Sequence, residues 1–291
     1  MAMQAQEKLA TKLEEIVLAR LAENTLTLPP PPLAVTRCLT LVRSPDFALR
    51  DSVPIIESDP VVAARVLKAA NSAAHGGMER AKSIGQAVTR IGVERLKSIL
   101  MEIAAQRLFE SRDPRIQEAC RGVWEHSLAV AMLSRDVAAL TGVEDTECAY
   151  LAGLLHDVGK PVVAWALLEA EKLVVGTRTN IWIDAALWVE AIQRSHRKAG
   201  TQLAVKWGLP ETIAAAIADS EEYDSLNRLS AGNCVRFANA LAKREGLYVG
   251  QIDPGDVDAL VMIGRSLLGM DDVVMQRLCS GLQDRVKSQL N

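Results

Sequence analysis

Apolar residues recur along most of the chain at the three- and four-residue spacing of amphipathic helices. No segment combines the two-residue alternation of a strand with hairpin turn residues, so the pattern predicts an all-α fold. Residues 1–25 are expected to form an amphipathic lead helix that packs either on its own domain or on an upstream partner domain. Its apolar positions are Leu9, Leu13, Ile16, Val17 and Leu21.

Aspartate followed by proline marks three predicted helix starts, because aspartate caps a helix and proline suits its first position. The pairs are Asp59-Pro60, Asp113-Pro114 and Asp253-Pro254, and the first helix is expected to run to about Asn71. Ser83 and Gln86 have the spacing of a capping box, and Gly92 provides a stop before another long helix. These signals divide the chain into many short helices.

Four successive parts are expected from these boundaries. They are the lead helix (residues 1–25), an N-terminal helical subdomain (26–112), a larger helical subdomain (113–246) and capping helices (247–291). The proline run at residues 28–33 predicts a stiff extended entry, and the polar segment 111–114 predicts the main boundary. Periodicity leaves open whether the last helices cap the bundle or form the face of a homodimer.

Composition and charge narrow the class of protein. The 291 residues are 49% hydrophobic and only 4% aromatic, which favours close-packed helices. A net charge of −3 gives no chain-wide attraction for phosphate backbones, so nucleic acid is not expected as a direct partner. Five separated cysteines predict reduced thiols, and the absence of a signal peptide or a long uncharged apolar run predicts a soluble, cytoplasmic protein without a membrane segment.

The candidate chemistry centres on His156 and Asp157, which end an apolar helix just before Gly159 and Lys160. Imidazole nitrogen and carboxylate oxygen can share a divalent metal, although such a pair is also common at an ordinary capped helix end. His126, on an Ala- and Leu-rich helix, is the candidate third ligand. His196 has charged neighbours and is either a solvated surface residue or functional. His75 is expected to be a loop residue.

Two segments in the first half of the chain carry a family likeness, namely residues 59–73 (DPVVAARVLKAANSA) and 83–92 (SIGQAVTRIG). The second half contributes Trp124, His126, residues 153–159, His196, Gly200 and residues 207–210. In this order they resemble the HD superfamily of metal-dependent phosphohydrolases, and more closely its HDOD branch, found in bacterial signalling proteins. The resemblance covers roughly residues 26–245. It implies a multi-helix HD-like bundle preceded by a smaller N-terminal helical bundle.

The resemblance also implies a metal site. His126, His156 and Asp157 match the first three ligands of the superfamily, whereas Asn239 stands where a fourth aspartate is expected. Residues 218–222 lack the histidines of phosphodiesterase relatives, and Asp219 would supply one oxygen at most. The remaining ligands would hold Fe, Mn, Zn or Mg more weakly. Lys160 and His196 are the candidate catalytic or phosphate-contacting residues, but Lys160 equally suits a cation at the end of the preceding helix.

The resemblance and the altered ligand set together predict a bacterial signal-transduction output or adaptor module. It would be the output half of a response regulator, acting without catalysis through contacts with signalling proteins or an upstream receiver or sensor domain. The alternative is a weak metal-dependent phosphohydrolase or phosphodiesterase acting on a nucleotide or cyclic dinucleotide. DNA binding through a helix-turn-helix around residues 90–97 is a third hypothesis. A packed helical hairpin is the better explanation of this segment.

Overall fold

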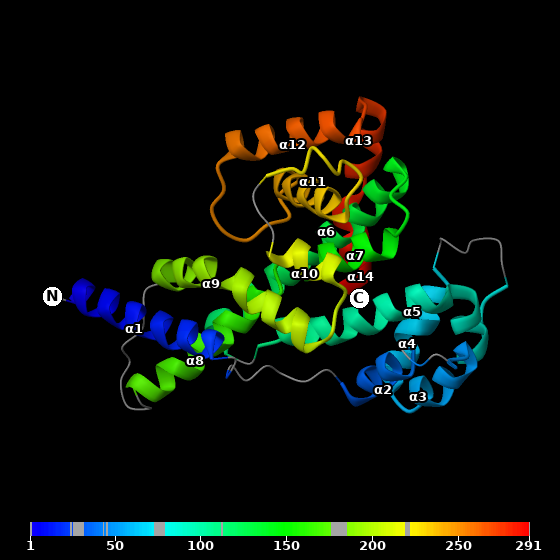
Figure 1. Cartoon of the computed structure of the whole chain (residues 1–291), viewed down its shortest axis with the longest axis horizontal. Coiled ribbons are helices and arrows are strands. Elements are labelled where there is room, and N and C mark those ends of the chain that lie inside the picture. The colour runs from blue at the N-terminus through cyan, green and yellow to red at the C-terminus, as the bar shows by residue number, and fades with distance from the viewer. Residues whose placement is uncertain are drawn as a thin grey trace. The chain divides into compact units, whose positions relative to one another are not determined.

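The computed structural model describes the whole chain except residues 1, 24, 26–31, 43, 45, 73–78, 112, 176–184, 219–221 and 291. Every regular element in the described residues is helical, and no strand occurs among them (Figure 1). The predicted all-α fold is therefore confirmed. His75, Asp219 and most of the proline run lie outside the described residues.

Two compact units make up the chain, Pro29–Arg107 and a larger unit of Met1–Leu28 with Leu108–Asn291. The smaller unit contains α2 (Leu33–Val42), the 3-10 helix η1 (Leu49–Ser52), α3 (Val53–Glu57), α4 (Pro60–Ala70) and most of α5 (Ile84–Phe109). The larger unit contains α1 (Ala2–Ala22), α6 (Pro114–Thr141), α7 (Thr146–Leu155), α8 (Gly159–Val175), α9 (Ala185–Lys206), α10 (Glu211–Ala218), α11 (Ala231–Arg244), α12 (Pro254–Leu268), α13 (Asp272–Cys279) and α14 (Leu282–Leu290).

Capping in the smaller unit follows the sequence signals. The Asp59 carboxylate accepts from the N–H groups of Val61 and Val62, which begins α4 as predicted. Ser83 Oγ accepts from the Gln86 N–H, but the Gln86 side chain turns back to the N–H of Lys82, one residue before Ser83. The capping box is therefore present with a one-residue shift.

Gly92 interrupts α5 with a φ of 75°, a conformation that residues with a Cβ rarely adopt. The predicted stop lies at this residue. The start signals predict short helices, and α6 is longer than this prediction. It spans 28 residues from the Asp113-Pro114 start. The helix packs along both α7 and α11, contacts for which no local sequence signal exists.

The helices at both ends of the chain pack within the larger unit. The lead helix α1 packs against α8 and α9 of its own unit and buries Leu13, Val17 and Leu21. At the other end of the chain, α12 packs on α11, while α13 and α14 contact α6. The C-terminal helices therefore cap the bundle. Whether the protein also forms a homodimer stays a prediction.

One apolar stretch in the described residues, Thr146–Glu171, is long enough by composition to cross a membrane. It comprises α7 and α8, and 83% of its most apolar window is buried inside the protein. Such burial is typical of core helices in a soluble protein. All five cysteines are free thiols.

Glycines allow close approach of the helices that surround the site. A Cβ at Gly153 of α7 would lie 2.7 Å from Ser134 Oγ and 2.9 Å from the carbonyl oxygen of Val130, both on α6. A Cβ at Gly159, the first residue of α8, would overlap the carbonyl oxygen of His196 on α9. The turn between α7 and α8 is thereby held tightly against α6 and α9.

Candidate metal centre

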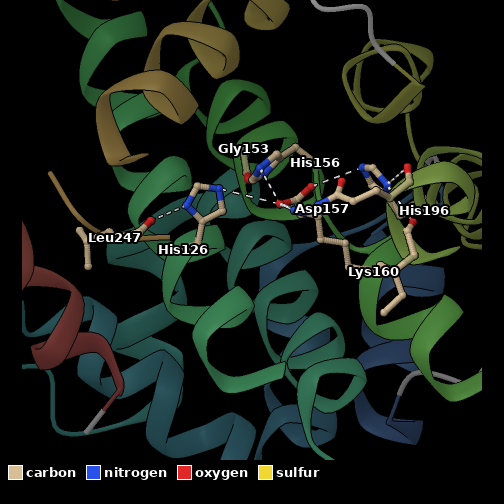
Figure 2. Close-up of polar contacts among 9 residues, drawn as sticks. His126, Gly153, His156, Asp157, Lys160, His196 and Leu247 are labelled. Carbon is tan, nitrogen blue, oxygen red and sulfur yellow. Dashed lines mark hydrogen bonds and ion pairs between the residues drawn. The ribbon is translucent and has the colours of Figure 1, made fainter. Parts of the chain in front are cut away.

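The turn between α7 and α8 carries His156 and Asp157 into the interior of the larger unit. His126 reaches Asp157 from the middle of α6, Lys160 from the first turn of α8 and His196 from α9 (Figure 2). His126, His156, Asp157 and His196 are all buried. Residues far apart in the sequence thus converge on one carboxylate.

The three imidazole rings are oriented in the same way. Nδ1 of His126 lies 2.6 Å from the carbonyl oxygen of Leu247, Nδ1 of His156 lies 2.7 Å from that of Gly153, and Nδ1 of His196 lies 2.8 Å from that of Gln193. A carbonyl oxygen only accepts, so we assign the hydrogen of each ring to Nδ1. Each Nε2 is left facing Asp157, as in histidines that bind metals through Nε2.

Asp157 presents its two oxygens to different groups (Figure 2). Oδ2 lies 2.6 Å from Lys160 Nζ, 3.3 Å from His156 Nε2 and 3.8 Å from His126 Nε2. Oδ1 lies 3.8 Å from His196 Nε2. The carboxylate therefore accepts from one ammonium group and lies close to three ring nitrogens.

Burial governs the charge of these groups. Desolvation lowers the pKa of His126 to about 3, and it also lowers the pKa of His196, so both rings are neutral at neutral pH. Burial by itself would raise the pKa of Asp157, but His156 and Lys160 together hold that pKa well below its usual range. The site at neutral pH thus contains an ionised carboxylate beside unprotonated ring nitrogens of His126 and His196.

Several buried atoms of the site lack a hydrogen-bond partner among the described residues. They are His126 Nε2, His156 Nε2 and Asn239 Oδ1. Leaving such atoms unsatisfied costs free energy, and metal coordination would satisfy them. The ligand atoms of His126, His156 and Asp157 all lie within 4.8 Å of one another. The chemistry and spacing of these three ligands fit a divalent metal.

A cavity of about 120 Å³ is lined by His156, Asp157 and Asn239. Asp157 is the one acidic residue among the described residues that line it, whereas four lining residues are basic: Lys160, Arg197, Arg236 and Lys243. Tyr248 also lines the cavity, and its ring meets the edge of the His126 ring at a centroid distance of 5.2 Å. The electrostatic character of the cavity is therefore basic.

The structure can be compared with the prediction for each site residue. The prediction of a solvated surface position for His196 is wrong, because its side chain is buried and faces Asp157. Lys160 forms an ion pair with Asp157, and a contact with phosphate stays a prediction. Asn239 lines the same cavity as His156 and Asp157, which agrees with its expected position beside the ligands.

Four residues of the site were missed from the sequence. Arg236 and Lys243 flank Asn239 at helical spacing, so the periodicity of α11 could have revealed them. Leu247 and Tyr248 follow the helix-ending Gly246, but the sequence has no signal that the carbonyl of Leu247 would meet His126, 121 residues away.

Comparison with known proteins identifies the class. Residues 28–223 match the model of the HDOD domain family, and the chain belongs to this family. The resemblance seen in the sequence is thereby confirmed.

Two individual proteins are similar to this chain, one in sequence and one in fold. An uncharacterised protein of Treponema pallidum (strain Nichols) is 26% identical over 205 residues, which cover 68% of this chain, and the chain spans only 38% of that protein's length. A crystal structure from Shewanella amazonensis SB2B, with the provisional name metal-dependent phosphohydrolase, is 22% identical with a TM-score of 0.72, covering 96% of this chain and 99% of that one.

Two further crystal structures share the fold. An HDOD domain protein of unknown function from Geobacter sulfurreducens is 22% identical with a TM-score of 0.63 and covers 98% of each chain. A protein from Marinobacter aquaeolei VT8, provisionally named a signal transduction protein, is 23% identical with a TM-score of 0.62, covering 97% of this chain and 65% of that one. At these identities the matches show the HD-like helical fold.

Proposed function

We propose that the chain is a signal-transduction domain that acts through contacts with other proteins and binds a divalent metal without catalysing hydrolysis. The observation that carries this proposal is the pairing of Lys160 with Asp157 at 2.6 Å. Membership of the HDOD family and the provisional name of the Marinobacter relative support the signalling role.

The donor set argues against efficient catalysis. His126, His156, Asp157 and Asn239 are the residues that would hold Fe, Mn, Zn or Mg. When bound, such a metal supplies a Lewis acid that activates water. The Asp157 carboxylate, however, already accepts from Lys160, and the amide of Asn239 brings no negative charge. A cation in this basic cavity would be bound weakly, so the site suits reversible binding better than sustained catalysis.

In this proposal the domain is the output half of a response regulator and receives its signal from an upstream receiver or sensor domain. Its free cysteines support a reducing compartment, and the cytoplasm is the proposed location. The response would pass to signalling partners through a change in helix packing within the larger unit.

A second candidate function is a weak phosphohydrolase acting on a nucleotide or cyclic dinucleotide. The observation that favours it is His196, whose neutral Nε2 faces Asp157 Oδ1 at 3.8 Å on one side of the basic cavity. An unprotonated imidazole in that position can accept a proton, and the basic side chains can hold phosphate oxygens.

Substitution of the shared carboxylate separates the two functions. The full chain carrying Asp157→Ala is compared with the parent in two assays, with Asp258→Ala on the exposed face of α12 as the matched control. The first assay measures hydrolysis of nucleotides, cyclic dinucleotides and a phosphodiester with added Mn²⁺. The second measures, in the source bacterium, the transcript changes that deletion of the gene causes.

The signalling proposal predicts that Asp157→Ala reproduces the deletion profile while the parent shows no hydrolysis above that of the variant. Metal-dependent turnover by the parent and Asp258→Ala that is lost in Asp157→Ala would instead establish the enzyme. An Asp157→Ala strain that behaves as the parent in both assays would contradict any role of the site.

A further inference from the structure

The connection between α11 and α12 lies against the middle of α6, where the candidate ligand His126 is located. We call residues 246–252 of this connection the strap. We propose that the strap is coupled to the metal site, so that it is held more tightly when His126 binds a cation and in turn holds the His126 ring for that cation. The inference rests on the metal binding in the proposed function and adds a regulatory element to it.

Three consecutive strap residues contact α6. The Leu247 carbonyl oxygen accepts from Nδ1 of His126 at 2.6 Å (Figure 2). The Tyr248 ring meets the edge of the His126 ring at a centroid distance of 5.2 Å. Val249 packs on Gly122, which precedes His126 by four residues on the same helix face, and a Cβ at Gly122 would overlap Val249 Cγ2. The strap is therefore attached to His126 and to the helix turn before it.

The strap has few other attachments. The Leu247 amide donates to the carbonyl of Ala242, but residues 248–252 make no hydrogen bond between main-chain groups in the part of the chain that the structure describes. Val249 and Ile252 are exposed. A segment without main-chain hydrogen bonds opens at low cost in free energy. The position of the strap thus depends on its contacts with α6.

The His126 ring links the strap to the metal site through its two nitrogens. Nδ1 donates to the Leu247 carbonyl, whereas Nε2 is buried, faces Asp157 and has no hydrogen-bond partner among the described residues. A cation on Nε2 would draw electron density from the ring and make the Nδ1–H group a stronger donor. Because coupling between two sites is reciprocal, release of the Leu247 carbonyl would weaken metal binding by the same factor.

Tyr248 provides a second link between the strap and the site. Lys160 Nζ lies 5.4 Å from the centroid of the Tyr248 ring, and Lys243 Nζ lies 5.0 Å from it. Lys160 is also the ion-pair partner of Asp157. A change in charge at the carboxylate therefore alters the contacts of an aromatic ring that belongs to the strap.

The strap connects this buried site with the surface of the larger unit. Its exposed end leads into Asp253, whose side chain caps the first turn of α12. Occupancy of the metal site would thus change how firmly an exposed segment is held, and displacement of that segment would release the cation.

Limited digestion of the full chain with chymotrypsin measures how firmly the strap is held. The enzyme cleaves after large apolar residues, and cleavage after Tyr248 requires the strap to leave α6. Leu226 is 98% exposed and is the control site in the same chain. We expect Mn²⁺ at saturating concentration, compared with EDTA, to slow cleavage after Tyr248 by about fivefold or more and to leave cleavage after Leu226 unchanged.

A pair of variants tests the reverse effect, that of the strap on the metal. Gly122→Ala changes no ligand but puts a Cβ where Val249 Cγ2 lies. Val249→Ala in the same chain removes that overlap, because the new Cβ would then lie 3.5 Å from the Cβ of residue 249, an ordinary contact. Gly85→Ala, where a Cβ meets nothing closer than 4.0 Å, is the matched control. Circular dichroism of each variant verifies that it is folded.

Calorimetric titration with Mn²⁺ gives the affinity of each protein. We expect Gly122→Ala to bind Mn²⁺ about fivefold or more weakly than the parent, and the double variant to recover most of the loss. Equal slowing of cleavage at Tyr248 and Leu226, unchanged affinity in Gly122→Ala, or no recovery in the double variant would overturn the inference while the metal site stands. A parent that binds no Mn²⁺ would overturn the metal-binding part of the proposed function and this inference with it.

Discussion

The ammonium of Lys160 lies 2.6 Å from Oδ2 of Asp157, the same oxygen that faces the ring nitrogens of His126 and His156. One carboxylate oxygen thus forms an ion pair with Lys160 and lies where it would also coordinate a bound metal. We therefore expect Lys160 and a divalent metal to compete for the negative charge of Asp157. In the absence of a metal, the ammonium of Lys160 would balance the buried carboxylate.

Removing the internal cation is expected to make the protein more dependent on metal. Lys160→Met leaves a buried carboxylate without its partner, which lowers the free energy of unfolding in EDTA by about 3 kcal/mol. Added Mn²⁺ should then raise the melting temperature of Lys160→Met more than that of the parent. Chemical unfolding in EDTA and thermal unfolding with and without Mn²⁺ measure both effects. Lys206→Met is the control, and an equal response of all three proteins to Mn²⁺ would refute the competition.

The contact between α8 and α9 depends on the missing side chain of Gly159. A Cβ there would overlap the His196 carbonyl, so Gly159→Ala must push the two helices apart and move His196 from Asp157. We expect a loss of at least about 2 kcal/mol in urea unfolding. A Cβ at Gly85 of α5 meets nothing closer than Ser83 Oγ at 4.0 Å, so Gly85→Ala should leave stability equal or slightly higher. Equal losses in the two variants would contradict this account of the helix contact.

The family segment at Asn71 stabilises the smaller unit. The Asn71 side chain accepts from the N–H of Ala81 at 2.8 Å and donates to its carbonyl at 3.1 Å. Asn71→Ala removes both bonds, and hydrogen exchange at the Ala81 amide should become faster by about tenfold or more. Ser72→Ala, at the exposed neighbouring position, is expected to leave that amide unchanged. Unchanged protection in Asn71→Ala would show that other contacts hold this segment.

Thiol reactivity should follow burial. Burial raises the pKa of Cys38, Cys120 and Cys234 from 9.0 to about 11, so their thiolate fraction near pH 8 falls about a hundredfold. Cys148 and Cys279 are only partly buried and should be alkylated first in the folded protein. Mass spectrometry after brief iodoacetamide treatment, with and without denaturant, reports each site. Labelling of Cys234 as fast as Cys279 in the folded chain would be the contrary result.

Local sequence signals correctly predicted the features that neighbouring residues determine. The Asp59-Pro60 start of α4 and the break at Gly92 are set by capping and backbone preference, and both lie at the predicted residues. The adjacency of His156 and Asp157 is likewise local. The family resemblance added His126 and Asn239 to the predicted site, although no rule of sequence spacing connects them to His156 and Asp157.

The features of the site that the sequence did not predict depend on long-range packing. The burial of His196 results from the approach of α9 to Gly159, which the charged residues around His196 concealed. The carbonyl of Leu247 fixes the His126 ring from the far end of α11, and this contact depends on how α11 crosses α6. The basic character of the cavity appears only once Arg197 of α9 and Lys243 of α11 share one space. Chain-wide charge, at −3, gave no indication of it.

His126, His156 and Asp157, with Asn239 beside them, are proposed to bind a divalent metal. The most direct measurement is metal content by inductively coupled plasma mass spectrometry, on the full chain purified without chelator or affinity-tag metal. The comparison protein is the double variant His156→Ala, Asp157→Ala. Because binding is expected to be weak, we predict less than one equivalent of Fe, Mn or Zn in the parent as purified, a rise towards one equivalent with added Mn²⁺ or Zn²⁺, and neither in the variant. A folded parent that contains no metal and takes up none from added Mn²⁺ or Zn²⁺ would contradict the claim.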